Sequence, residues 1–129
     1  MNEANMNGLT QSEWKELEQS LLDQRSSIVE RLRRHEELAR EAHEGAADES
    51  DLASEESERS VTLRLLDKER KLLRELDTAI LKLKDETYGL CEGSGEPIGF
   101  ARLKARPWAR YSLSYKEELE TQERGYARG

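Results

Sequence analysis

The sequence predicts a mainly α-helical protein: a long antiparallel coiled-coil hairpin on a small globular base, with a short C-terminal helix. Charged residues make up 38% of the 129-residue chain and hydrophobic residues 35%, a balance typical of long helices that bury only a narrow apolar stripe. Two long segments without Gly or Pro repeat apolar residues at helical spacing, and a short stretch rich in Gly, Ala, Asp and Ser separates them. A compact region rich in turn residues follows.

The first helix is predicted from Gln11 to about residue 44. Its apolar face recurs at spacings of three, four and seven residues. The members of this face are Trp14, Leu17, Leu21, Ile28, Leu32, His35, Ala39 and Ala42. Glu13 and Glu16 place negative charge in the first turn, at the positive end of the helix dipole. Gly45 is the expected stop.

The second helix is predicted from about Leu52 to residue 86, after a tip near residues 45–53. Asp48, Ser50 and Asp51 are all suitable N-caps for it. Its expected apolar face consists of Val61, Leu65, Leu72, Leu76, Ala79 or Ile80, and Leu83. Because the connection is short, residues 11–86 should form an antiparallel hairpin.

Residues 87–129 are predicted to form the globular base and its C-terminal helix, and residues 1–10 an N-terminal extension. The expected core of the base consists of Trp14, Tyr88, Ile98, Phe100, Leu103, Trp108 and Tyr111. The hairpin and the base differ in charge, because residues 41–58 contain eight acidic residues and no Lys or Arg, whereas residues 99–116 contain five basic residues and no acidic one. One end could therefore meet a basic partner and the other an acidic partner.

Several protein classes are disfavoured by the composition. A single cysteine excludes an internal disulfide. No apolar run approaches a membrane span, and the N-terminus lacks the features of a signal peptide, so we expect a cytoplasmic protein without membrane contact. The sequence contains no nucleophile–base pair, phosphate-binding loop or metal cluster, so we do not expect an enzyme.

Residues 91–115 have the spacing of a zinc ribbon without its ligands. Cys91 and Ser94 are three residues apart, as are Ser112 and Tyr115, which matches the C-x2-C…C-x2-C pattern of tetrahedral zinc sites. Serine hydroxyls and a tyrosine phenol are poor zinc ligands. We therefore predict no metal here, and a packed turn held by hydrogen bonds and aromatic contacts in its place.

The stretch "YGLCEGSGEPIGFARLKARP", residues 88–107, resembles the zinc-ribbon region of the DksA/TraR family of transcription factors. The preceding run "DKERKLLRELDTAILKLKD" resembles the second coiled-coil helix of that family. The resemblance covers roughly residues 10 to 120. Three of the four zinc cysteines are missing, as in the zinc-independent members of the family.

The resemblance implies that the hairpin inserts into the secondary channel of RNA polymerase and alters the stability of promoter open complexes, while the base rests on the channel rim. Members act as monomers, and their partner is core RNA polymerase and not a specific DNA sequence. At the tip, the D-x-x-D-x-A pattern of the family corresponds to Asp48, Asp51 and Ala53, which would lie near the polymerase active site.

The resemblance also implies contacts to polymerase and to ppGpp, the alarmone of the stringent response. The matching positions are Lys68, Leu72, Arg106 and Lys116. Glu75 stands where a lysine is usual, and a carboxylate is unfavourable beside a polyphosphate. The ppGpp response is therefore left open, as are the target promoters and the balance between activation and inhibition.

Two other functions stay open. The base could bind nucleic acid through its basic residues, with aromatic side chains to stack on bases. These residues are Arg102, Lys104, Arg106, Arg110 and Lys116, with Trp108 and Tyr111. The chain could instead be a coiled-coil scaffold that dimerises through its hairpin.

Overall fold

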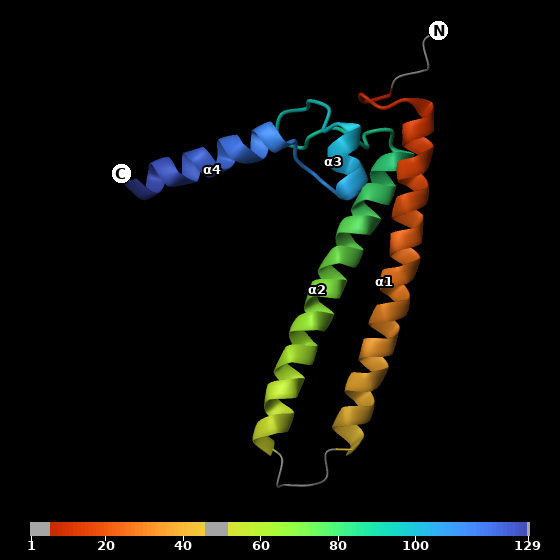
Figure 1. Cartoon of the computed structure of the whole chain (residues 1–129), viewed down its shortest axis with the longest axis vertical. Coiled ribbons are helices and arrows are strands. Elements are labelled where there is room, and N and C mark those ends of the chain that lie inside the picture. Colours follow the sequence, from red (N-terminus) through yellow and green to blue (C-terminus); the bar gives the residue numbers. More distant parts are fainter. Residues whose placement is uncertain (1–5, 46–51, 129) are drawn as a thin grey trace. The chain divides into compact units, whose positions relative to one another are not determined.

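The computed structural model describes residues 6–45 and 52–128, with side chains for residues 6–41 and 56–125. The described residues form four helices: α1 (Gln11–Gly45), α2 (Leu52–Lys84), α3 (Phe100–Ala105) and α4 (Leu113–Arg128) (Figure 1). The predicted mainly α class is confirmed. The chain divides into a hairpin unit, Asp23–Asp77, and a base unit formed by the residues up to Leu22 and from Thr78 onward. Within the described ranges, no helix combines the length and the apolar character of a membrane span.

In the hairpin unit, α1 and α2 lie side by side in opposite directions (Figure 1). Three polar contacts define their pairing, since Arg25 contacts Asp77, His35 contacts Glu69, and Glu36 contacts Arg70. Residue numbers rise along α1 as they fall along α2, which is the predicted antiparallel arrangement.

The apolar face predicted for the second helix is wrong in its first half. Val61 and Leu65 are 59% and 41% exposed, whereas Leu66 is only 3% exposed. The buried line of α2 passes through Leu66, Glu69 and Leu76 at spacings of three and seven. Because a glutamate occupies a core position of this line, the apolar periodicity alone selected the neighbouring face.

The base unit is closed by the residues immediately before α1. Met6 and Leu9 exchange two backbone hydrogen bonds, and the turn between them places Asn7 and Gly8 at φ values of 57° and 82°. Leu9 is 1% exposed. Thr10 and Glu13 then form a reciprocal capping box: the Thr10 N–H donates to Glu13 Oε1 at 2.9 Å, and the Glu13 N–H donates to Thr10 Oγ1 at 3.1 Å.

The core of the base unit differs in part from the predicted one. Tyr88 and Leu103 are buried as expected, and Tyr88 packs edge-to-face on Trp14 with ring centroids 5.7 Å apart. The Tyr88 hydroxyl donates to the carbonyl of Pro107 at 2.7 Å. The other members of the predicted core are half-buried: Trp14, Ile98, Phe100, Trp108 and Tyr111. Residues outside that set are also buried, namely Leu9, Leu17, Leu21, Ala79, Cys91 and Pro107.

Candidate functional site

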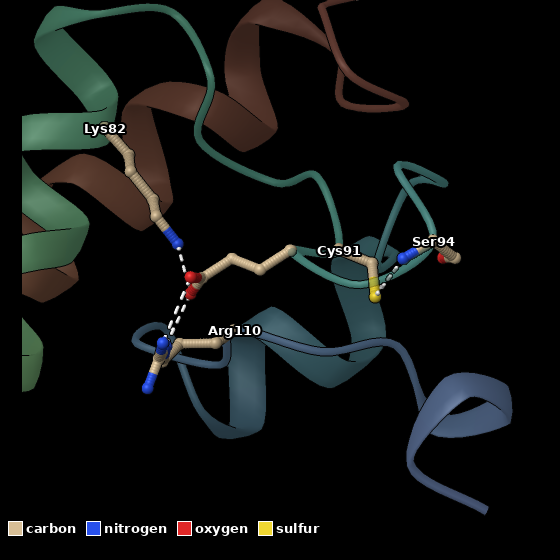
Figure 2. A network of polar contacts seen from close by, with 5 residues as sticks. Lys82, Cys91, Ser94 and Arg110 are labelled. Atoms are coloured by element: carbon tan, nitrogen blue, oxygen red, sulfur yellow. Dashed lines mark hydrogen bonds and ion pairs between the residues drawn. The ribbon is translucent and has the colours of Figure 1, made fainter. Parts of the chain in front are cut away.

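Three of the four positions of the zinc-ribbon pattern meet at the sulfur of Cys91, and the Cys91 residue is 3% exposed. The backbone N–H of Ser94 donates to this sulfur at 3.4 Å (Figure 2). Ser112, itself 7% exposed, also hydrogen-bonds to the sulfur through its backbone and side chain. The second half of the pattern is linked in turn, since the Tyr115 N–H donates to Ser112 Oγ at 3.3 Å. Hydrogen bonds to one sulfur thus join the two C-x2-C halves.

These contacts decide the charge state of Cys91. Burial alone would raise the pKa of the thiol, because it disfavours the thiolate. The hydrogen bonds that Ser94 and Ser112 donate outweigh burial and lower the pKa from 9.0 to about 6. The lowered pKa favours the thiolate, which is the form of the sulfur that accepts hydrogen bonds most strongly.

Tyr115, the fourth position of the zinc-ribbon pattern, packs against the turn at Gly93. A Cβ atom at Gly93 would lie 2.1 Å from two ring carbons of Tyr115, so glycine allows the ring to cover this turn. Tyr115 also stacks on Tyr111, with centroids 5.5 Å apart and an interplanar angle of 28°. The position of the Tyr115 ring is therefore explained by its packing against Gly93 and Tyr111.

The donor set does not fit a structural zinc ion. One thiolate, two serine hydroxyls and a stacked phenol replace the four soft or nitrogen ligands that zinc requires. Among the described residues, no group of three or more His, Cys, Asp or Glu side chains is arranged so that it could hold a metal ion.

A second polar network lies beside the thiolate and is centred on Glu92. Figure 2 shows Lys82 of α2 and Arg110 pointing toward the same carboxylate. Arg110 Nε and Lys82 Nζ lie 2.5 and 2.9 Å from Glu92 Oε2, and a second Arg110 nitrogen lies 3.1 Å from Oε1. The hydrogen bonds from Arg110 and then those from Lys82 lower the pKa of Glu92 to about 2, against the opposing effect of burial. This network ties the end of α2 to both halves of the ribbon.

Several cations of the basic segment have partners within the base unit. Arg102 Nε donates to the carbonyl of Tyr111 at 2.9 Å. Lys104 lies over the Phe100 ring at 5.7 Å and 4.0 Å from Glu16. The guanidinium of Arg106 lies 6.0 Å from the centre of the Trp108 ring. These contacts compete with an incoming phosphate for the same charges.

The four predicted polymerase and ppGpp contacts fall in different units. Lys68 and Leu72 lie one turn apart on α2 in the hairpin unit, the first exposed and the second half-buried. Arg106, directly after α3, and Lys116, in the first turn of α4, are exposed in the base unit. Their roles stay predictions.

Of the predicted tip residues, Asp48 and Asp51 lie outside the described residues. Ala53 lies in the first turn of α2, and its side chain is outside the described set. The roles of all three residues stay predictions.

Two further contacts illustrate what the sequence-based expectations left out. Asn7 Nδ2 donates to the carbonyls of Glu86 and Tyr88, both at 2.8 Å, and its Asn-Gly dipeptide was an available signal for a tight turn. The other is the pair of His35 and Glu69 inside the hairpin unit. A glutamate at seven-residue spacing from Leu76 was the available signal there.

Comparison with known proteins identifies the family to which the chain is similar. Residues 13–83 match the family profile described as DnaK suppressor protein DksA, N-terminal domain, and residues 86–114 match the prokaryotic dksA/traR C4-type zinc finger. An RNA polymerase-binding transcription factor DksA of Caulobacter vibrioides is 41% identical over 106 residues, which cover 82% of this chain and 75% of the relative. The Escherichia coli protein of the same name is 40% identical over 80 residues, covering 62% and 53%.

Solved structures agree with these matches. The structure of transcription factor DksA2 from Pseudomonas aeruginosa has a TM-score of 0.82 and 38% sequence identity, and the similarity covers 88% of each chain. Two family profiles that match consecutive segments, a relative at 41% identity and this structural likeness show that the chain belongs to the DksA/TraR family.

Proposed function

We propose that this protein binds core RNA polymerase and regulates transcription by inserting the tip of its hairpin into the secondary channel, which alters the stability of promoter open complexes. The observation that carries the proposal is the 41% identity over 106 residues to a protein named as an RNA polymerase-binding transcription factor. The likeness to the family extends beyond the long helices, because the ribbon profile matches residues 86–114. The protein acts as a cytoplasmic monomer and not as an enzyme.

The base performs this function without zinc. The hydrogen bonds to the Cys91 sulfur and the Glu92 network join the two halves of the ribbon, and these are the same segments that a zinc ion would join. A base held in this way can keep its surface for polymerase without a bound metal.

A ppGpp response would require Lys68, Leu72, Arg106 and Lys116 to act together at the polymerase interface. Glu75 lies seven residues after Lys68 on the same face of α2 and is half-buried. Its carboxylate would oppose a polyphosphate near Lys68. We therefore propose a weak ppGpp response, which Glu75→Lys should strengthen.

The proposal is tested by binding to core RNA polymerase in the absence of DNA. We expect binding that another secondary-channel factor competes away and that Lys68→Glu weakens. Lys71→Glu is the matched control, because it makes the same charge change at an exposed α2 position outside the predicted contacts. Binding that requires DNA and falls steeply with salt would favour the nucleic-acid alternative. Dimers in sedimentation experiments without polymerase binding would favour the scaffold.

A further inference from the structure

Asn7 and Gly8 form the tight turn that precedes α1. Met6 and Leu9 exchange two backbone hydrogen bonds across this loop, at 2.9 and 3.0 Å. The φ values of Asn7 and Gly8 are 57° and 82°, and positive φ at both central residues is the mark of a type I′ turn. The backbone of Gly8 also lies close to Pro97, since a Cβ atom added to Gly8 would lie 2.8 Å from the Cβ of Pro97. The turn is therefore closed within itself and packed against the base unit.

The same Asn-Gly pair is chemically reactive when the chain is free to move. Because Gly8 has no side chain to shield it, its backbone nitrogen can lose its proton and attack Cγ of Asn7. A new C–N bond closes a five-membered succinimide ring, and the side-chain amide leaves as ammonia. Water then opens the ring at one of its two carbonyl carbons, which gives aspartate or isoaspartate. The other asparagines, Asn2 and Asn5, do not precede a glycine.

The turn holds the reacting atoms apart. In a type I′ turn the first central residue has a ψ of about 30°, the mirror image of type I. At this ψ the Gly8 nitrogen and the Cβ of Asn7 lie on opposite sides of the Cα–C bond, whereas ring closure requires them on the same side. Asn7 Nδ2 also donates to the carbonyls of Glu86 and Tyr88, both at 2.8 Å, which engages both of its hydrogens. Ring closure therefore requires the turn to open and both hydrogen bonds to break.

The products of the reaction do not fit the closed turn. An aspartate carboxylate only accepts hydrogen bonds, so it would face the carbonyl oxygens of Glu86 and Tyr88 with the same polarity. These carbonyls follow the C-terminal end of α2, where a negative charge is unfavourable. Isoaspartate also inserts a methylene group into the backbone between Met6 and Leu9. Once the reaction has taken place, the original contacts do not form again.

We propose that Asn7 is a deamidation site that the closed base unit protects. Its amide is stable while residues 6–9 stay docked, and it is converted to aspartate and isoaspartate when they detach. The reaction needs no enzyme, and water is the only co-reactant. Each opening that leads to reaction leaves a permanent chemical change at the junction between the start of α1 and the end of α2. This inference is independent of the proposed function.

The first test follows Asn7 in the full chain by peptide mass spectrometry during incubation in mildly alkaline buffer. Deamidation should be at least about tenfold slower in buffer than in guanidinium chloride that unfolds the base, because the rate follows the population of the open state. At intermediate concentrations the rate should rise with the unfolded fraction, which tryptophan fluorescence reports because Trp14 and Trp108 both lie in the base unit. Equal rates in buffer and denaturant, or no deamidation in denaturant, would overturn the proposal.

The second test loosens the turn without changing Asn7 or Gly8. Leu9 is 1% exposed, so Leu9→Ala leaves a cavity beside the turn. Leu81→Ala is the matched control, because Leu81 lies in the same unit and is 59% exposed. In buffer, Asn7 should deamidate at least about tenfold faster in the Leu9 variant than in the control. In denaturant the two rates should be equal, since the reacting pair is the same.

Equal rates of these two variants in buffer would overturn the control of the reaction by the closed base. If Leu9→Ala does not fold, the denaturant series of the parent decides the question without it. The effect of the product is tested with Asn7→Asp, which should melt below the parent. Gln122→Glu makes the same amide-to-acid change at an exposed position of α4 and should melt with the parent. An Asn7→Asp variant as stable as Gln122→Glu would refute the loss of the contacts on deamidation.

Discussion

The backbone N–H of Ser94 donates a hydrogen bond to the sulfur of Cys91 across 3.4 Å. These two residues occupy the first C-x2-C pair of the ribbon pattern, in which a metal would normally join the two side chains. Ser112, from the second pair, hydrogen-bonds to the same sulfur. The sulfur thus accepts hydrogen bonds from both pairs of the ribbon pattern.

The purified protein should contain well below stoichiometric zinc and should keep its fold in a chelator. A base organised by zinc unfolds when the metal is removed, because the free energy of metal binding is then part of the free energy of folding. Elemental analysis and circular dichroism with and without chelator measure both points. The matched control is Ser94→Cys with Ser112→Cys and Tyr115→Cys, which should acquire zinc and become sensitive to chelator. Stoichiometric zinc in the parent protein would make Cys91 a metal ligand.

The stability of the base should decrease as the pH falls from 9 to 6. The pKa of Cys91 is about 6 in the folded protein and 9.0 for an ordinary thiol. A lowered folded-state pKa stabilises the fold fully above the unfolded value, and this contribution is lost as the pH falls through the folded value. The difference corresponds to at most about 4 kcal/mol. The ultraviolet absorbance of the thiolate should titrate near pH 6, and Ser112→Ala should move this midpoint upward. A midpoint near 9 in the parent protein would contradict the assignment.

The long helices were predictable because their signals are local. Periodicity and Gly45 predicted helices of residues 11–44 and 52–86, and the structure has Gln11–Gly45 and Leu52–Lys84. The inner face of α2 was not predictable in the same way. Glu69 interrupts the apolar line that includes Leu66 and Leu76, and only its partner His35, 34 residues earlier, makes a glutamate acceptable there.

The candidate site was predictable only in part, because its contacts are formed between distant segments. The ribbon spacing grouped Cys91 with Ser94 and Ser112, but it contained no information on the hydrogen bonds to the sulfur or on the charge of that sulfur. The partners of Glu92 come from α2 and from the segment before α4, 10 and 18 residues away. Asn7 contacts carbonyls 79 and 81 residues later, a separation that no periodicity spans.

Glu92→Gln should destabilise the base by about 1–2 kcal/mol at neutral pH, because it removes a charge-assisted contact to Arg110 and Lys82 that is one-third exposed to solvent. The folded-state pKa of Glu92 is lowered to about 2 from 4.5. Its contribution is therefore complete above pH 4.5 and is lost as the pH falls toward 2. Urea denaturation at several pH values should show the difference between parent and variant shrinking over this interval. A difference that stays constant down to pH 2 would exclude the ionised carboxylate as its source.

Asn7→Ala should lower the stability of the base by about 1–3 kcal/mol, because it removes both hydrogen bonds to the carbonyls of Glu86 and Tyr88 and places alanine at a φ of 57°. Asn7→Gly is the matched control, since glycine adopts this φ without strain but lacks the amide. Thermal unfolding should rank the parent above the glycine variant, and that variant above or level with alanine. Equal stability of all three proteins would show that the turn before α1 does not hold the base.

Asp48→Asn with Asp51→Asn should abolish the effect on promoter open complexes while polymerase binding stays within about threefold of the parent. Most of the contact area is expected from the sides of the hairpin and from the base, so the loss of two tip charges removes little of it. An effect on open complexes requires a contact that differs between two arrangements of the polymerase, and not affinity alone. Open-complex lifetime at saturating protein measures this effect.

Asparagine keeps the size of aspartate and much of its capping ability, so the two helices should remain folded in the double variant. Circular dichroism therefore separates two roles of the same residues. A large loss of helicity would show that the main role of Asp48 and Asp51 is to cap α2. Unchanged helicity together with the same open-complex lifetime as with the parent protein would remove both aspartates from the set of effector residues. We expect unchanged helicity, normal polymerase binding and lost regulation. This result would assign the affinity to the sides of the hairpin and the base, and the regulatory effect to the tip.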